Sequence, residues 1–230
     1  MKKILCLLLS LLLTGCAGTP AETKPVELKG ALTLHCLEGA VLVQCNGENL
    51  LVDCGIMPQT LEEYGVETLS AIVLTDCEEA RREHLEAILE QYPADVWSSE
   101  ALPAKDQWLD CAHMTLLGQE DALALKIEFG EDSFLLAGSM NREAQTALAE
   151  RWGESLRSDV LHVHVAPAEA DVLRKAAEPE YLMVDGKADR ANFQGMEVFD
   201  TEGFGAVRMQ TEGNGIQTAW SLHTSHDVAS

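Results

Sequence analysis

Short apolar runs rich in β-branched residues, separated by turns, follow one another from residue 31 and recur in the second half of the chain. Residues 31–37, 40–45 and 49–53 predict three strands, because Asn46-Gly47 between two apolar runs is typical of a hairpin turn. The next predicted elements are a strand over 71–75, an amphipathic helix over 79–92 that is ended by a proline, and a strand over 95–97.

The second half of the chain repeats this arrangement. Its predicted strands cover 114–117, 123–129, 133–137, 159–165 and 181–184, and its predicted helices cover 142–152 and 169–177. Three further strands are expected between Met196 and Leu222. Strands followed by strand–helix–strand, occurring twice, predict an α/β (α+β) fold: an αββα sandwich of two mixed sheets with flanking helices.

The N-terminus carries a targeting signal. Two lysines precede an apolar run over residues 4–13, which is too short to span a bilayer. The run ends in Leu13-Thr14-Gly15-Cys16, which resembles the lipobox of bacterial lipoproteins. We therefore expect residues 1–15 to be a lipoprotein signal peptide and Cys16 to carry lipid. An ordinary secretory signal, in which the cysteine is incidental, is the alternative.

The rest of the chain divides into a tether, a domain and a tail. Residues 16–28 are expected to be the lipidated cysteine and a polar tether, 29–223 one domain, and 224–230 a flexible tail. The formal net charge is −22, with 38 acidic against 16 basic residues, and a surface this acidic repels nucleic acid, which argues against nucleic acid as a partner. The predicted location is the outer side of the cell membrane, held there by lipid.

Five cysteines remain after the signal peptide and Cys16. They are expected to be small buried hydrophobic residues, and one disulfide is allowed without an assigned pairing. Their spacing matches no zinc-binding pattern, since the chain has no Cys-x-x-Cys. They are Cys36, Cys45, Cys54, Cys77 and Cys111.

Several strand-end motifs resemble those of the metallo-β-lactamase fold, and in particular the hydrolase-like domain of ComEC-type competence proteins. The matching segments are Glu38-Gly39-Ala40 at the opening turn, Leu51-Val52-Asp53-Cys54-Gly55, Val73-Leu74-Thr75, Phe134 to Ser139, and Ser158 to Ala166. This resemblance implies the same sandwich and, in the family, an active site with two metal ions, usually zinc.

The family's metal ligands are missing from the matching positions. The opening turn has Ala40 in place of an aspartate, and Ser139 stands where the family has the aspartate that bridges the metals. The His-x-His-x-Asp-His ligands and the later histidine pair are replaced by Asp76, Glu78, Ala80, Arg81, Val165 and Ala166. A cation at Arg81 opposes binding of a dication. The resemblance therefore implies the fold but not the reaction, and no cofactor is expected.

A rebuilt metal site is the alternative. Asp53, Asp76 and Glu78, with His84 or His164, could bind Zn²⁺ or Mn²⁺ and make Asp76, Glu78 and His84 catalytic. We favour the plainer interpretation, in which Asp76 caps the following helix and His84 is a surface histidine. His162 and His164 are then a pair of half-exposed histidines on one face of a strand.

The sequence thus predicts a membrane-anchored, extracytoplasmic domain that is non-catalytic. It would bind a protein partner or small ligand at the old active-site cleft or along the edge of the sandwich. The alternative function is a divergent, competence-related, metal-dependent hydrolase.

Overall fold

The computed structural model describes residues 30–75, 82–103, 109–119, 122–164, 169–188, 193 and 195–221. The predicted signal peptide, Cys16, the tether and the tail over 224–230 lie outside these residues. In the part of the chain that is described, no helix is long and apolar enough to cross a membrane.

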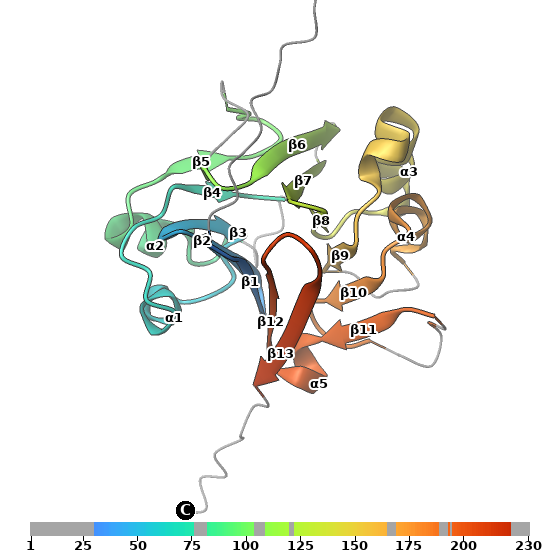
Figure 1. The fold of residues 1–230 in the computed structure, drawn as a ribbon. Helices are drawn as coiled ribbons and strands as arrows, with labels where there is room; N and C mark the ends of the chain where they lie inside the picture. Colours follow the sequence, from blue (N-terminus) through green and yellow to red (C-terminus); the bar gives the residue numbers. More distant parts are fainter. Residues whose placement is uncertain are drawn as a thin grey trace, which may run out of the picture.

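Two sheets pack face to face, with helices on the outer side of each (Figure 1). The first sheet is mixed, with β3–β4–β5 parallel and the remaining neighbours antiparallel. Its strands, in spatial order, are β13 (Ile216–Ser221), β12 (Ala206–Thr211), β1 (Leu32–Leu37), β2 (Ala40–Cys45), β3 (Glu48–Val52), β4 (Ala71–Val73) and β5 (Asp95–Trp97). Its helices are α1 (Pro58–Glu63) and α2 (Leu85–Gln91).

The second sheet is also mixed, with β8–β9–β10–β11 parallel and β6–β7–β8 antiparallel. In spatial order it contains β11 (Glu197–Asp200), β10 (Tyr181–Val184), β9 (Val160–Val163), β8 (Asp132–Leu136), β7 (Ala122–Phe129) and β6 (His113–Gln119). The helical segments of this half are α3 (Arg142–Trp152), the 3₁₀ turn η2 (Gly153–Leu156), α4 (Asp171–Ala177) and α5 (Thr201–Phe204).

Three apolar layers explain this architecture. Alternate side chains of both sheets meet in the central layer, which includes Leu34, Val43, Phe134 and Met183. A second layer packs α3 and α4 on the second sheet, and a third packs α1 and α2 on the first. The predicted αββα sandwich of two mixed sheets is therefore confirmed.

The predicted elements differ from the observed ones mainly at their ends. The strand predicted over 49–53 stops at Val52, because Asp53 adopts a left-handed backbone with φ of 61°. The helix predicted over 79–92 is wrong at residues 82–84, which form a turn before α2, while 79–81 lie outside the described residues. Helix α1 was not predicted, since its single turn and a half has no apolar stripe.

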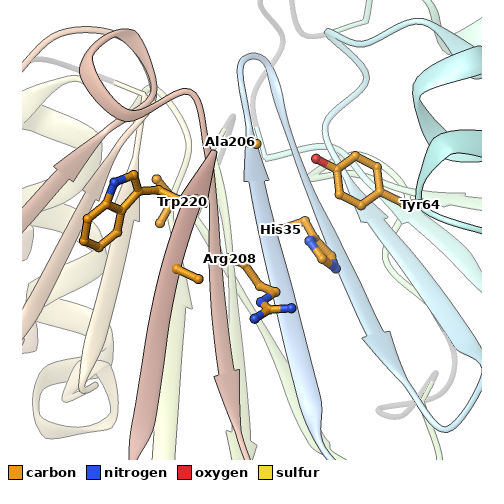
Figure 2. A pocket seen from close by; sticks show the side chains of 7 residues that line it. His35, Tyr64, Ala206, Arg208 and Trp220 are labelled. Atoms are coloured by element: carbon orange, nitrogen blue, oxygen red, sulfur yellow. The ribbon is translucent and has the colours of Figure 1, made fainter. Parts of the chain in front are cut away.

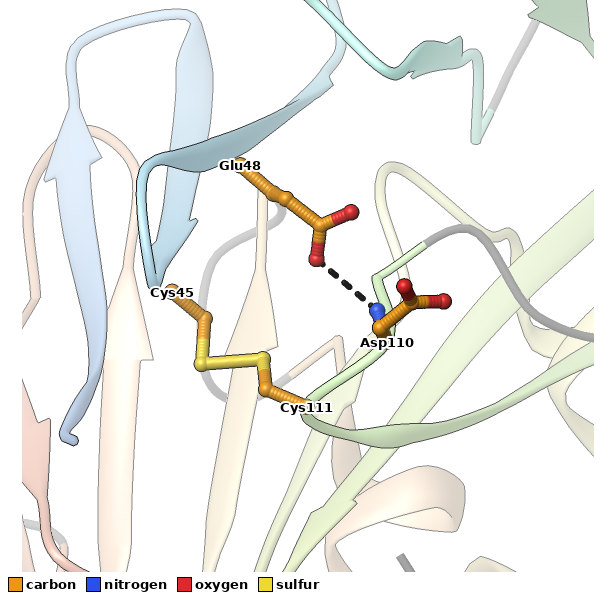
Figure 3. The surroundings of a disulfide bond; sticks show 4 residues. All are labelled: Cys45, Glu48, Asp110 and Cys111. Carbon is orange, nitrogen blue, oxygen red and sulfur yellow. Dashed lines mark hydrogen bonds between the residues drawn. A yellow bond between two sulfur atoms is a disulfide. The ribbon is translucent and has the colours of Figure 1, made fainter. Parts of the chain in front are cut away.

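A disulfide joins Cys45, at the end of β2, to Cys111, two residues before β6 (Figure 3). It therefore links the two sheets across 66 residues of chain. Beside it, a carboxylate oxygen of Glu48 accepts a hydrogen bond of 2.8 Å from the backbone N–H of Asp110. Cys36 and Cys54 are free and buried, as expected, and Cys45–Cys111 is a disulfide of the kind that the sequence allowed without assigning it. Cys77 lies outside the described residues.

Candidate functional site

Polar side chains gather where parallel strands of the two sheets end. Asp53 follows β3 of the first sheet, while His164 and Asp185 follow β9 and β10 of the second. His162 lies within β9. We call Asp53, His162, His164 and Asp185 the strand-end cluster.

Asp53 is buried and fixed by the end of β4. One carboxylate oxygen accepts a hydrogen bond of 2.8 Å from the backbone N–H of Thr75, and the other accepts one of 2.7 Å from the Thr75 hydroxyl. The backbone N–H of Asp53 donates to the carbonyl of Val73 at 2.8 Å. The left-handed backbone at Asp53 thus accompanies a carboxylate that is hydrogen-bonded to Thr75, two residues after the end of the neighbouring strand β4.

The His164 ring lies between two carboxylates contributed by opposite sheets. Its Nε2 atom is 3.7 Å from Oδ2 of Asp53, and its Nδ1 atom is 4.0 Å from Oδ2 of Asp185. The His164 side chain has 0% of its surface exposed, and that of Asp185 has 3%. Charged groups buried in this way need close partners of opposite charge, and a protonated His164 would have one on each side.

Asp185 connects the second sheet to the first. Its Oδ2 atom accepts a hydrogen bond of 2.8 Å from the backbone N–H of Gly39, in the turn between β1 and β2. Its Oδ1 atom accepts one of 3.0 Å from the hydroxyl of Thr201. The turn is held close because Gly39 and Gly55 touch: a Cβ atom added to Gly39 would lie 2.9 Å from the Cα atom of Gly55.

His162 and His164 pack against each other inside the sandwich. Their ring centroids are 4.8 Å apart with an interplanar angle of 83°, and His162 is 1% exposed. The prediction of a half-exposed histidine pair is therefore wrong. It failed because β9 is an interior strand of the second sheet, with the first sheet on one side and α3 and α4 on the other.

The structure brings together only some of the predicted site residues. Asp53 and His164 meet, whereas Ser139 is half-buried in the loop after β8 and Ala40 is buried in β2. His84, expected at the surface, is half-buried where α2 begins, and its backbone N–H donates to the Cys54 carbonyl at 3.2 Å. The remaining predicted positions lie outside the described residues: Asp76, Glu78, Ala80, Arg81, Val165 and Ala166.

Asp185 was missed by the sequence reasoning. The available signal was its place directly after the predicted strand 181–184, next to Gly186. Polar residues at the carboxyl ends of parallel strands are the positions where sites form in such folds. Thr201, which donates to Asp185, could not have been found, because nothing in the sequence relates the two residues.

The strand-end cluster does not fit a dinuclear metal centre. Among the described residues, no group of three or more His, Cys, Asp or Glu side chains is arranged to hold a metal ion. All four carboxylate oxygens of Asp53 and Asp185 already accept hydrogen bonds. The family's chemistry, a metal-bound water acting as nucleophile, therefore finds no support in the described side chains.

The two free thiols beside this cluster are held protonated. Burial, and next the charge of Asp53, raise the pKa of Cys54 to about 12. Burial, and next the charge of Asp185, raise the pKa of Cys36 to about 12. Because the thiolate is the nucleophilic form, this environment does not activate either thiol as a nucleophile.

Known structures with the same architecture are metallo-β-lactamase-fold proteins. The metallo-β-lactamase-fold protein YhfI from Bacillus subtilis is similar with a TM-score of 0.51 and 12% identity, over 82% of this chain and 100% of its own. Igni18, a metallo hydrolase from the archaeon Ignicoccus hospitalis, is similar with a TM-score of 0.52 and 13% identity, over 84% of this chain and 100% of its own. No family model matches the sequence, and a search of curated proteins finds no match. At such low identity the similarity shows the fold, which is that of the metallo-β-lactamases.

Proposed function

We propose that this chain is a lipid-anchored, extracytoplasmic protein whose metallo-β-lactamase-fold domain is non-catalytic and binds a partner. The observation that carries the proposal is the His164 side chain, which has no exposed surface and lies between Asp53 and Asp185 at the strand ends. If the resemblance to ComEC-type domains holds, the family's metal ligands would lie at the same strand ends. Ser139, at the position of the bridging aspartate, supports the same conclusion.

Burial argues against turnover at this location. Hydrolysis requires a substrate and a water molecule at the reacting groups, yet the side chains of Asp53, His164 and Asp185 are 0%, 0% and 3% exposed. Their hydrogen bonds instead tie the end of β3 to the end of β4, through Asp53 and Thr75, and the end of β10 to the turn between β1 and β2, through Asp185 and Gly39. In this account the cluster stabilises the sandwich and the binding role belongs to another surface.

Hydrolase assays test the proposal. The polypeptide from Ala17, without lipid and with Zn²⁺ or Mn²⁺ supplied, is incubated with a chromogenic phosphodiester and a chromogenic β-lactam. We expect rates equal to those of buffer containing the metal. Metal-dependent turnover that is lost in Asp76→Ala and Glu78→Ala but kept in Glu83→Ala, a change at an exposed glutamate of the same region, would overturn the proposal.

That contrary result would favour the second candidate, a divergent metal-dependent hydrolase related to competence proteins. Two observations favour it: the fold is shared with the metallo hydrolase Igni18, and Asp53 and His164 lie within 3.7 Å of each other. Asp76, Glu78 and His84 would complete its site, with Zn²⁺ or Mn²⁺ bound.

The anchoring part of the proposal rests on Leu13-Thr14-Gly15-Cys16 and on the Cys45–Cys111 disulfide. Disulfides persist in oxidising, extracytoplasmic compartments and are rare in the cytosol. Labelling of cells with radioactive palmitate should mark the chain and leave Cys16→Ser unlabelled. A labelled Cys16→Ser protein, or an unlabelled natural chain, would contradict lipidation at this cysteine.

A further inference from the structure

Strand β13 is an edge strand of the first sheet, and its own sequence lacks the charges and prolines that usually protect such edges. Among the described strands it pairs only with β12, at the end of the first sheet. Natural edges are blunted by charges, prolines or bulges, because an open edge pairs readily with another extended chain. The sequence of β13, Ile-Gln-Thr-Ala-Trp-Ser, contains neither a charge nor a proline.

The outer face beside this edge carries a cation. Arg208 of β12 is exposed and stands directly opposite Ala219 of β13 in the register. Because Ala219 has only a methyl group, the long Arg208 side chain is accessible across β13 from the edge. Figure 2 shows Arg208 near His35, beside a hollow of about 280 Å³ that Tyr64 and Ala219 also line.

This hollow favours an anionic ligand. Within the described part of the chain, no carboxylate forms an ion pair with Arg208. Burial, and then the charge of Arg208, outweigh the hydrogen bond to Gln44 and lower the pKa of His35, so His35 is neutral at pH 7. The hollow thus carries the positive charge of Arg208 in a chain whose formal net charge is −22.

The opposite face of β13 presents an aromatic side chain. Successive residues of a strand point to opposite faces, so Trp220 points away from Ala219. It packs at 5.2 Å from the Phe204 ring and 6.1 Å from the Phe199 ring, measured between centroids, yet 51% of Trp220 is exposed. A chain added to β13 would therefore meet a cation on one face and an apolar ring on the other.

We propose that β13 binds an extended segment of a partner protein by strand addition, and that this segment alternates acidic with apolar residues. Backbone hydrogen bonds to the open edge give the affinity, and the alternate side chains give the specificity. An acidic residue beside Ala219 reaches Arg208, and its apolar neighbour covers Trp220. This inference rests on the proposed binding role and names the surface and the partner chemistry.

Peptide binding tests the inference. The probe is dye-labelled Thr-Val-Glu-Val-Glu-Val-Thr, titrated with the polypeptide from Ala17 and followed by fluorescence anisotropy, with Thr-Val-Lys-Val-Lys-Val-Thr as its matched comparison. We expect the acidic peptide to bind at least about tenfold more tightly than the basic one. Amide chemical-shift changes on binding should be largest at residues 217–221.

Charge reversal supplies the sharpest control. Arg208→Glu should weaken binding of the acidic peptide at least about tenfold, because like charges then repel. The same change should strengthen binding of the basic peptide, because opposite charges then attract. Arg142→Glu, the same change at an exposed arginine of α3, should alter neither affinity. Trp220→Ala should weaken binding of both peptides. The midpoint of urea denaturation of each variant shows whether that variant is folded.

Four results would overturn the inference. The first is equal binding of both peptides, and the second is an equal effect of Arg208→Glu and Arg142→Glu on binding. The third is peptide binding only after removal of residues 222–230, which would mean that the chain's own tail occupies the edge. The fourth is dimerisation through β13, measured by sedimentation. None of them bears on the hydrolase assays, so the inference and the proposed function can fail separately.

Discussion

The strand-end cluster and the β13 edge differ in exposure and in how their charges are met. In the cluster, carboxylates from opposite sheets each lie within 4.0 Å of the ring of His164, and these side chains are at most 3% exposed. At the edge, Arg208 is exposed with no acidic partner among the described residues, and half of Trp220 faces solvent. Among the described residues, the polar groups at the strand ends are thus withdrawn from solvent and partnered within the protein, while the edge strand leaves a cation and an aromatic ring accessible.

The largest effect is expected from opening the cluster. Asp53→Ala removes both hydrogen bonds to Thr75 and leaves His164 facing a cavity, which should lower the free energy of unfolding by about 4 kcal/mol. Urea denaturation measures the change. Asp95→Ala, at an exposed carboxylate of β5, should change it by less than about 0.5 kcal/mol. Equal effects of the two variants would show that the cluster does not stabilise the sandwich.

The disulfide should have the next largest effect. Replacing Cys45 and Cys111 together by alanine frees a loop of 66 residues, which should lower the free energy of unfolding by about 3 kcal/mol. The natural chain treated with a reductant should lose a similar amount. A double variant as stable as the natural, oxidised chain would contradict a role for this link in holding the sheets together.

The alkylation rate of the Cys54 thiol measures how readily solvent reaches the strand-end cluster. With its pKa raised from 9.0 to about 12, it should react with iodoacetamide about a thousand-fold more slowly than a thiol of ordinary pKa. Peptide mass spectrometry after timed labelling measures this rate, and unfolding in urea should abolish the protection. Rapid labelling of Cys54 in the folded chain would mean that solvent reaches the cluster.

The smallest predicted effect is on the pH dependence of stability and concerns His35, which lines the hollow beside Arg208. Its folded-state pKa is lowered below the ordinary value of 6.5, so the unfolded chain takes up more protons at this residue. The stability it contributes is present above pH 6.5 and is lost as the pH falls through the folded-state pKa. Urea midpoints between about pH 7.5 and pH 5 should fall more for the natural chain than for His35→Gln. Parallel curves would mean that His35 is not held neutral.

The sequence predicted the fold better than the site. Apolar alternation and turn residues located strands such as β2 and β10 to the residue, because both signals are local. Periodicity also placed His162 and His164 on one face, but it could not tell that α3, α4 and the first sheet cover both faces of β9. The contact between His164 and Asp53 joins two sheets across 111 positions of chain, from residue 53 to residue 164.

Arg208 and the disulfide lay beyond sequence reasoning for the same physical reason. The accessibility of Arg208 depends on Ala219 of the neighbouring strand, and that pairing is fixed only by the register of β12 and β13. The pairing of Cys45 with Cys111 depends on how the two sheets are stacked. Helix α1 was missed because a short helix is stabilised by packing more than by its own pattern.

Metal content tests the central claim most directly. The polypeptide from Ala17, expressed without a histidine tag and with Zn²⁺ and Mn²⁺ supplied, is purified and measured by inductively coupled plasma mass spectrometry. The account predicts less than about a tenth of a metal ion per chain, because a formed dinuclear site would retain its ions. One or two ions held per chain, and lost in Asp76→Ala or Glu78→Ala, would contradict it.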